Sequence, residues 1–300
     1  MTDFDPAIYN RLFIVNFIKM NRNWFILNLL LIMNYYTIEP RQRLAEYVRY
    51  FWVLEGEVTQ DKPYIHRSMA NSCPELFFHY NGVFEELLSP DIWTSSFASG
   101  LHGQSQQISR FRISQSFGLF GAYLYPYAIP LIFNIPASAL SNQIPDLVSL
   151  LGQEGKDLEE KIMTCGSNDQ RTIILSDFLE KRLQKNARDH SAVFSSINYI
   201  LQRKGSVNIE KLSSDYFLSS RQFERKFKEF SGFAPKLYSR IVRFQSALME
   251  YGNTHKSLTD IAYDCGYYDQ SHFIHEFKEF SGHHPKSYFH GHAEGTEWRG

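Results

Sequence analysis

The chain has 300 residues, of which 43% are hydrophobic and 16% aromatic, and it carries a formal net charge of −1 at pH 7. This composition excludes a disordered chain, and the length is enough for two domains with cores of their own. The cysteines Cys73, Cys165 and Cys265 lack the spacing of a metal site and cannot all pair, which favours a reducing, cytoplasmic location.

Residues 1–33 differ in texture from the rest of the chain. Their apolar and polar residues alternate, and they end in the apolar run 24–33, which is about half of the ~20 residues that a membrane span requires. No small-residue cleavage site follows, which argues against a signal peptide. We expect Met33 to be the native start and the first 32 residues to be an upstream extension or a loose appendage. An interfacial membrane helix is the alternative.

The stretch from Tyr35 to about Phe133 has the pattern of a β domain. Short aromatic and β-branched runs alternate with clusters of Gly, Pro, Asn and Ser; the runs are 48–58, 75–80, 108–113 and 117–125. Such runs predict a sandwich or a barrel. Five aromatic residues of these runs either line a ligand cavity or, more plainly, pack an alternating core. They are Phe51, Trp52, Phe77, Phe78 and Tyr80.

After Pro136 the apolar spacing becomes helical, in the segments 144–151, 158–163 and 171–183. The polar stretch 181–189 has the composition of a linker, so we place a domain boundary near residue 190. The predicted fold class is α+β with two domains. Residues 34–190 form a β-rich, barrel- or sandwich-like domain with trailing helices, and residues 191–290 form an all-α domain followed by the tail 291–300.

One pattern occurs twice in residues 209–289. Ten positions between Phe223 and Tyr238 recur, with identical residues, 50 positions later. Each copy predicts a helix, a short turn and a second helix whose phenylalanines share one face. Between the copies, residues 236–251 predict one linker helix. Caps and breaks support these assignments: Ser219 and Asp269 at the helix starts, Gly266 in the second turn and Pro235 in the first turn of the linker helix.

The second helix of each copy leaves a polar face outside. In the first copy this face carries Arg221, Glu224, Arg225 and Lys228, and in the second Gln270, Ser271, Ile274, His275 and Lys278. Arginine, glutamate and glutamine can bond base edges, and lysine is suited to phosphate. Residues 221–243 hold seven basic and two acidic residues, a net +5 that marks a nucleic-acid footprint. Because a histidine binds phosphate strongly only when protonated, we expect the first copy to supply more of the affinity.

These residues resemble the DNA-binding domain of AraC-type bacterial transcription regulators, over roughly residues 192–290. In the first copy the resemblance rests on Ser219, Arg221, Phe223, Arg225, Phe227, Gly232 and Pro235. In the second it rests on residues 260–262, 266–267, 269–273, 277–278, Gly282 and Pro285. It implies two helix-turn-helix units that insert recognition helices into successive major-groove segments. Arg221, Glu224, Arg225, Gln270, Ser271 and His275 match base-facing positions, and Lys228 and Lys278 match backbone-facing ones.

The chain departs from the family pattern at two positions. Tyr216 stands where the second copy has Gly266, which predicts a looser first turn, and His275 stands where many relatives carry arginine. The front half also resembles a domain found on a subset of AraC-type regulators, in segments 44–55, 74–76, 121–123 and 135–137. That resemblance implies that the front half senses an effector, which related regulators hold inside a small β-barrel.

Signals of catalysis are weak. The sequence has no Gly-rich phosphate loop and no nucleophile elbow. A barrel could gather His66, His79 and His102 around a metal, but ordinary burial or exposure explains them as well. We interpret Glu85-Glu86 as a solvated turn, His283-His284 as a loop, and Cys265 as a packed core residue rather than a redox sensor. We therefore predict no enzymatic activity, no catalytic or metal-binding residues and no cofactor.

The sequence predicts a cytoplasmic transcription regulator whose partner is double-stranded DNA. Further expected partners are a small-molecule effector, a second copy of the chain and, for an activator, RNA polymerase; no membrane partner is expected. Two alternatives concern the front half. It could be a cupin-like isomerase or dioxygenase, which would purify with a bound metal, or a module that dimerises without any ligand.

Overall fold

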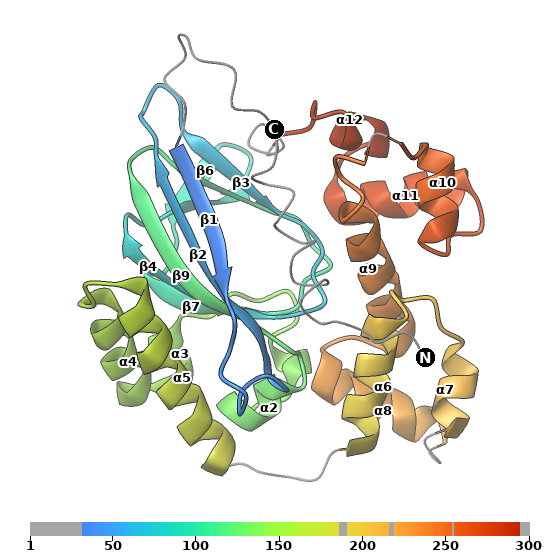
Figure 1. Cartoon of the computed structure of the whole chain (residues 1–300), viewed down its shortest axis with the longest axis horizontal. Helices are drawn as coiled ribbons and strands as arrows, with labels where there is room; N and C mark the ends of the chain where they lie inside the picture. Colours follow the sequence, from blue (N-terminus) through green and yellow to red (C-terminus); the bar gives the residue numbers. More distant parts are fainter. Residues whose placement is uncertain (1–31, 186–190, 216–218, 254, 295–300) are drawn as a thin grey trace.

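The computed structural model describes residues 32–185, 191–215, 219–253 and 255–294 (Figure 1). The front domain contains two antiparallel sheets. The larger has the strand order β1-β2-β9-β4-β7 and the smaller the order β3-β8-β5-β6. The strands of the larger sheet are β1 (Ile32–Ile38), β2 (Val48–Glu57), β4 (Glu75–Asn81), β7 (Ser99–His102) and β9 (Phe117–Leu124). Those of the smaller are β3 (Tyr64–Ser68), β5 (Glu85–Ser89), β6 (Ile92–Ser95) and β8 (Ser109–Ile113).

Of the two predicted alternatives the structure shows the sandwich, because no strand pairing closes the two sheets into a barrel in the described part of the chain. Strand β9 lies at the centre of the larger sheet, and all eight of its residues are buried. Gly121 on β9 is paired with Trp52 on β2. A Cβ at Gly121 would approach the Trp52 ring to 2.5 Å, so this pairing requires glycine.

Helices cover the outer face of the larger sheet, where α4 and α5 pack in Figure 1. Leu158, Ile162, Leu175 and Leu179 join the sheet residues of this core. The helices of the front domain are α2 (Ala128–Phe133), the short 3-10 helix η2 (Ala137–Ala139), α3 (Leu147–Leu151), α4 (Gln153–Met163) and α5 (Asn168–Lys185). The helical segments predicted after Pro136 are thus confirmed, with α4 and α5 longer than predicted.

Two sequence-based predictions for the front half were wrong. Glu85 and Glu86 lie in strand β5 rather than in a turn, and Glu85 is opposite Arg112 on β8. Residues 128–133 form helix α2 within the stretch that we expected to be β. Met33 lies inside β1, which pairs with β2, and its role as the native start of the chain stays a prediction. The extension 1–31 and the linker residues 186–190 lie outside the described residues.

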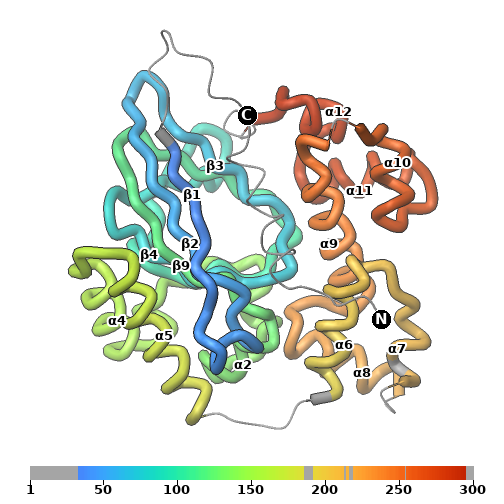
Figure 2. The backbone as a smooth tube through the Cα atoms, in the orientation of Figure 1, coloured from blue at the N-terminus to red at the C-terminus, as the bar shows by residue number. Residues whose placement is uncertain are grey.

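The back domain is all helical. Its helices are α6 (Ser191–Gln202), α7 (Ile209–Asp215), α8 (Ser220–Ser231), α9 (Pro235–Leu248), α10 (Leu258–Asp264), α11 (Gln270–Ser281) and α12 (Pro285–Phe289). Helix α9 is the predicted linker helix. Figure 2 shows α6, α7 and α8 around one end of it and α10, α11 and α12 around the other. No helix in the described ranges is long and apolar enough to cross a membrane.

The local signals at the helix ends are confirmed. The Ser219 hydroxyl accepts from the backbone N–H of Gln222 in a reciprocal capping box, and the Asp269 carboxylate accepts from that of His272. Gly266 adopts φ +77°, as a turn between two helices requires. Tyr216, its counterpart in the first copy, lies outside the described residues.

Candidate DNA-binding surface and interdomain cavity

The two helix-turn-helix units bury the same face. Phe223, Phe227 and Phe230 of α8 are buried, as are the equivalent Phe273, Phe277 and Phe280 of α11. Phe227 meets Tyr238 with ring centroids 5.5 Å apart, and Phe277 meets Tyr288 at 5.3 Å, both edge to face. The internal repeat is therefore a repeat of packing as well as of sequence.

Burial of these rings turns the polar residues of α8 and α11 outward. All eight side chains predicted to contact DNA are exposed: Arg221, Glu224, Arg225, Lys228, Gln270, Ser271, His275 and Lys278. None of these side chains has a hydrogen bond or an ion pair to another described residue. Exposed groups without intramolecular partners are available to phosphates and base edges.

The positive charge predicted for residues 221–243 is smaller on the surface than the count suggests. Arg240 and Arg243 of α9 both bind Glu276 of α11, at 2.9 and 3.1 Å, and Glu276 is only 1% exposed. Arg240 also binds Glu279, at 2.6 Å. These two arginines join the linker helix to the second unit, so the estimate of +5 overstates the charge that is free for DNA. Sequence reasoning missed these pairs because Glu276 lies 33 and 36 residues away in the chain.

The front domain contacts the C-terminal end of each recognition helix. At the first unit, the Ser141 hydroxyl donates to the carbonyl of Gly232, at 2.7 Å. At the second, the Arg67 Nε donates to the carbonyl of Ser281, at 3.1 Å, and the Ala70 N–H donates to that of Phe280, at 3.0 Å. We call these bonds the interdomain clamp. Because the clamp holds both helix ends, it restricts movement of one unit relative to the other.

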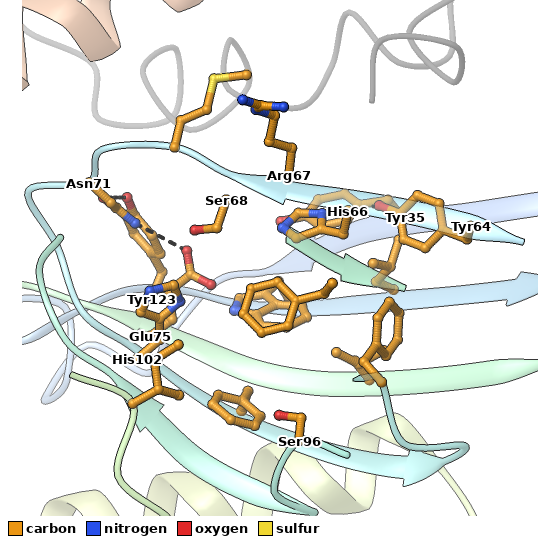
Figure 3. A pocket seen from close by; sticks show the side chains of 18 of the residues that line it. Tyr35, Tyr64, His66, Arg67, Ser68, Asn71, Glu75, Ser96, His102 and Tyr123 are labelled. Carbon is orange, nitrogen blue, oxygen red and sulfur yellow. Dashed lines mark hydrogen bonds between the residues drawn. The ribbon is translucent and has the colours of Figure 1, made fainter. Parts of the chain in front are cut away.

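A cavity of about 330 Å³ lies between the two sheets and reaches the back domain. Figure 3 shows Tyr35, Tyr64, His66, Glu75, His102 and Tyr123 around it. Gln245 and Leu248 of α9 and Glu294 also line it. The cavity is therefore in contact with the linker helix that joins the two helix-turn-helix units.

A hydrogen-bond network connects this cavity to α9. The Asn71 Nδ2 donates to the Glu75 carboxylate at 3.2 Å, and the Asn71 Oδ1 accepts from the Gln245 Nε2 at 2.8 Å. The Tyr123 hydroxyl also donates to the Asn71 Oδ1. The Gln245 Oε1 in turn accepts from the Ser72 hydroxyl, at 2.6 Å. Asn71 thus bonds both the acid in the cavity and the linker helix.

Comparison with known proteins agrees with the organisation of the back domain. A family profile described as a helix-turn-helix domain matches residues 212–291. The HTH-type transcriptional activator RhaS of Escherichia coli O157:H7 is 34% identical over 67 residues, which are 22% of this chain and 24% of RhaS. RhaS of Shigella boydii serotype 18 matches to the same extent. The back domain is a helix-turn-helix domain. The chain spans about a quarter of the length of these curated relatives.

The front domain matches a second profile, described as a domain of unknown function (DUF6597), over residues 36–146. Among solved structures, ToxT from Vibrio cholerae gives a TM-score of 0.47 at 14% identity, over 80% of this chain and 98% of ToxT. ToxT from Vibrio cholerae strain SCE256, bound to an unsaturated fatty acid, gives a TM-score of 0.46 at 15% identity. This match covers 80% of this chain and 94% of that ToxT chain.

The aromatic residues singled out in the front half divide between the cavity and the core. Trp52 and Phe77 line the cavity, whereas Phe51 and Phe78 pack in the core under α4 and α5. The Tyr80 hydroxyl donates to Glu55, at 2.5 Å. The alternation of the strands places neighbouring residues on opposite faces, so both interpretations are correct for part of the set.

The three front-half histidines do not form a metal site, since no group of three metal-ligating side chains gathers in the described part of the chain. Burial lowers the pKa of His79 to about 4, although its ring bonds the carbonyl of Phe97. Burial and the neighbouring His66 lower the pKa of His102 to about 4 as well. His79 and His102 are therefore neutral at pH 7.

Proposed function

We propose that this chain is a sequence-specific regulator of transcription, in which α8 and α11 read successive major-groove segments on one side of double-stranded DNA. The observation that carries the proposal is the pair of exposed polar faces, without intramolecular partners, at equivalent positions of the repeat. Two recognition helices in successive segments should bind sequence blocks about one helical turn, roughly 10 bp, apart. Such a protein works in the cytoplasm, and RNA polymerase is a further partner if it activates.

The roles of individual residues follow from their chemistry. We assign Arg221, Glu224 and Arg225 of α8, and Gln270, Ser271 and His275 of α11, to base edges. Lys228 and Lys278, at equivalent positions near the ends of the two helices, are assigned to phosphates.

The front domain has the proposed role of modulating this activity through an effector in the cavity. Support comes from the position of the cavity, since a ligand there would be close to Gln245 of α9 and to the clamp residue Arg67. A change in either contact would alter how the two recognition helices are held. Modulation by dimerisation is the second candidate, and the mass of the purified protein in solution, with and without DNA, distinguishes the two.

The test is selection from genomic DNA. The purified full chain is incubated with sheared DNA of its own genome at near-physiological salt, which suppresses non-specific phosphate binding, and the retained fragments are sequenced. We expect a few intergenic sites with two conserved blocks about one turn, roughly 10 bp, apart. A variant with Arg221, Arg225 and Lys228 all changed to Ala is the matched control, and it should retain no such sites. Equal enrichment by the control would refute the residue assignment, and no enrichment by the folded wild type would refute the proposal.

The same preparation tests the enzyme alternative. A front domain that works as a cupin-like isomerase or dioxygenase would carry a stoichiometric metal, which elemental analysis detects. We expect a metal content far below one atom per chain.

A further inference from the structure

We propose that the cavity of the front domain binds a small organic cation, whose ammonium group pairs with the Glu75 carboxylate inside a lining of tyrosine and tryptophan rings. This inference deepens the proposed function, because it names the chemical class of the effector. It rests on the charge balance of the cavity, on its aromatic lining and on the contacts of Glu75.

The first observation is a carboxylate without a cationic partner. Three side chains among the described lining residues carry carboxylate or guanidinium groups, namely Glu75, Arg67 and Glu294. Arg67 and Glu294 bind each other, at 3.2 Å. Glu75 is bonded by the Asn71 amide and has no ion pair with any described residue. Glu75 is half-buried, and a partly desolvated carboxylate without a counter-charge is costly, so a cation in the cavity would gain pairing energy there.

Arg49 lies beside the lining ring of Tyr123 and is a basic residue that could have neutralised Glu75. Its guanidinium instead donates to the Cys73 Sγ, at 3.7 Å, and lies over the rings of Tyr123 and Tyr125, at 5.4 and 5.8 Å. An arginine therefore already lies over Tyr123, one of the rings that line this cavity.

The second observation is the aromatic lining around the carboxylate. Tyr35 on β1, Tyr50 and Trp52 on β2, and Tyr123 on β9 line the cavity together with Glu75 on β4. Tyr50 and Tyr123 stack, with ring centroids 5.1 Å apart. Electron-rich ring faces and one carboxylate form the site that proteins use for ammonium ligands.

The titration of the site agrees with this chemistry. Burial raises the pKa of Glu75 to about 7, against an opposing hydrogen bond from Asn71. The pKa of Tyr35 is raised by burial and by the charges of Tyr50 and Glu75. His79 and His102, with pKa values of about 4, add no positive charge that would repel a cation at pH 7. A bound cation would hold Glu75 ionised and lower its pKa.

The size of the site limits the ligand. A volume of about 330 Å³ lies at the lower end of ligand pockets, which span roughly 300–1,000 Å³. An amine with a single aromatic ring or a short alkyl body fits these dimensions.

The network through Asn71 gives the ligand a route to the DNA-binding domain. An ammonium group that bonds Glu75 competes with the Asn71 amide for the same carboxylate. Asn71 also accepts from Gln245 of the linker helix. Binding should therefore disturb the bond between the front domain and α9, and with it the affinity for DNA.

The experiment uses three probes of matched shape and different charge, namely phenethylammonium, phenethyl alcohol and hydrocinnamate. Their binding to the full chain is measured by calorimetry at pH 8, where Glu75 is ionised. We expect the cation to bind at least about tenfold more tightly than the alcohol, and the anion to bind least. Glu75→Gln should reduce the preference for the cation to less than about twofold, because charge is removed and shape is kept. Glu57→Gln, at an exposed position of β2, is the control and should keep the preference.

Folding of Glu75→Gln is checked by its thermal unfolding. The pKa of Glu75 is higher in the folded chain, at about 7, than its ordinary value of 4.5, so wild type loses stability as pH rises from about 4.5 to about 7. Glu75→Gln should melt at a higher temperature than wild type at pH 8, and the difference should shrink as pH falls toward about 4. The titratable or charged groups around Glu75 are Tyr35, Arg49, Tyr50, Cys73 and Tyr123. These groups and the cavity histidines are present in both wild type and Glu75→Gln. The difference in melting temperature between the two proteins therefore reports on Glu75 alone.

Three results would overturn the inference: equal or tighter binding of the alcohol or the anion, a cation preference that survives in Glu75→Gln, or no binding of the cation at millimolar concentration. Selection from genomic DNA is scored separately. Enriched operator sites without cation binding would refute the inference alone. Cation binding without enriched sites, in the presence or absence of the probe, would refute the regulator proposal and leave the site in place.

Discussion

The two helix-turn-helix units have the same framework and different surfaces. Position 226 of the first unit is an exposed lysine, whereas its equivalent, position 276 of the second, is a buried glutamate bonded to Arg240 and Arg243. Arg225 likewise corresponds to His275. The first unit thus offers permanent positive charge to solvent, and the second uses a carboxylate to bond the linker helix.

This difference suggests a division of labour. A unit with free arginines can supply affinity and base readout, while a unit with buried ion pairs is held firmly against α9. The clamp from the front domain then fixes both recognition helices at their C-terminal ends. If this view is correct, matched substitutions at equivalent positions should have unequal effects.

The largest difference should come from Glu276→Ala. It leaves Arg240 and Arg243 without their shared partner, and breaking a buried pair in this way costs about 3 kcal/mol of unfolding free energy, the lower end of the usual range because both arginines are partly exposed. Lys226→Ala, at the equivalent position, should change it by less than about 0.5 kcal/mol. Urea unfolding of both variants measures the two values. Equal losses of unfolding free energy in the two variants would show that the buried ion pairs of Glu276 do not hold the second unit more firmly than the first.

Arg225→Ala should have the next largest effect, on DNA binding. It should cost about 1–3 kcal/mol and relax the preference at one base position, as expected for an arginine that bonds a base edge. His275→Ala should cost less than about 1 kcal/mol, because an imidazole cannot form the bidentate contact that a guanidinium forms with a base. Binding of all single-base variants of one operator measures both. A larger loss for His275→Ala would reverse the assignment of affinity to the first unit.

Lys228→Ala should weaken binding to every sequence alike. A phosphate contact carries no base information, so the expected loss is about 1 kcal/mol, with a reduction of about 1 in the slope of log affinity against log salt. Lys278→Ala should behave in the same way, because the two lysines occupy equivalent exposed positions. Titrations at several salt concentrations provide the slopes. A sequence-dependent loss in either variant would show that its lysine contacts a base.

The smallest effect should come from the clamp at the first unit. Ser141→Ala removes the hydroxyl that donates to the carbonyl of Gly232, and should lower the unfolding free energy by about 1 kcal/mol. Ser89→Ala, at an exposed end of β5, is the control and should stay within about 0.5 kcal/mol of wild type. Urea unfolding of wild type and both variants at a single pH measures the three unfolding free energies. Identical stabilities for Ser141→Ala and the control would show that this bond does not hold the first unit.

Much of the back domain could be predicted because its signals are local. The spacing of Phe223 and Phe227 identifies the buried face of α8, and Ser219 and Gly232 mark its two ends. The exposed residues of the candidate DNA surface follow, since whatever is not on the buried face points to solvent. Their contacts with DNA stay a prediction.

The front domain was harder to predict because its elements depend on distant partners. Glu85 looks like part of a solvated turn until its strand pairs with β8 and brings it to Arg112, at 2.7 Å. Residues 128–133 contain Pro130, and their burial against the sheet stabilises a short helix that the sequence alone does not indicate. Glu75 gave no signal as a binding residue, because its lining partners come from six other strands.

The sequence by itself determined the double helix-turn-helix framework, the faces that it buries and the polar residues that it exposes, because helix periodicity and capping act over a few residues. Only the tertiary structure decided which charges are free and which are paired. Arg240 and Arg243 turn to Glu276, while Glu75 stays without a cation among the described residues. Such pairings depend on how segments far apart in the chain pack together, and packing is a property of the whole fold.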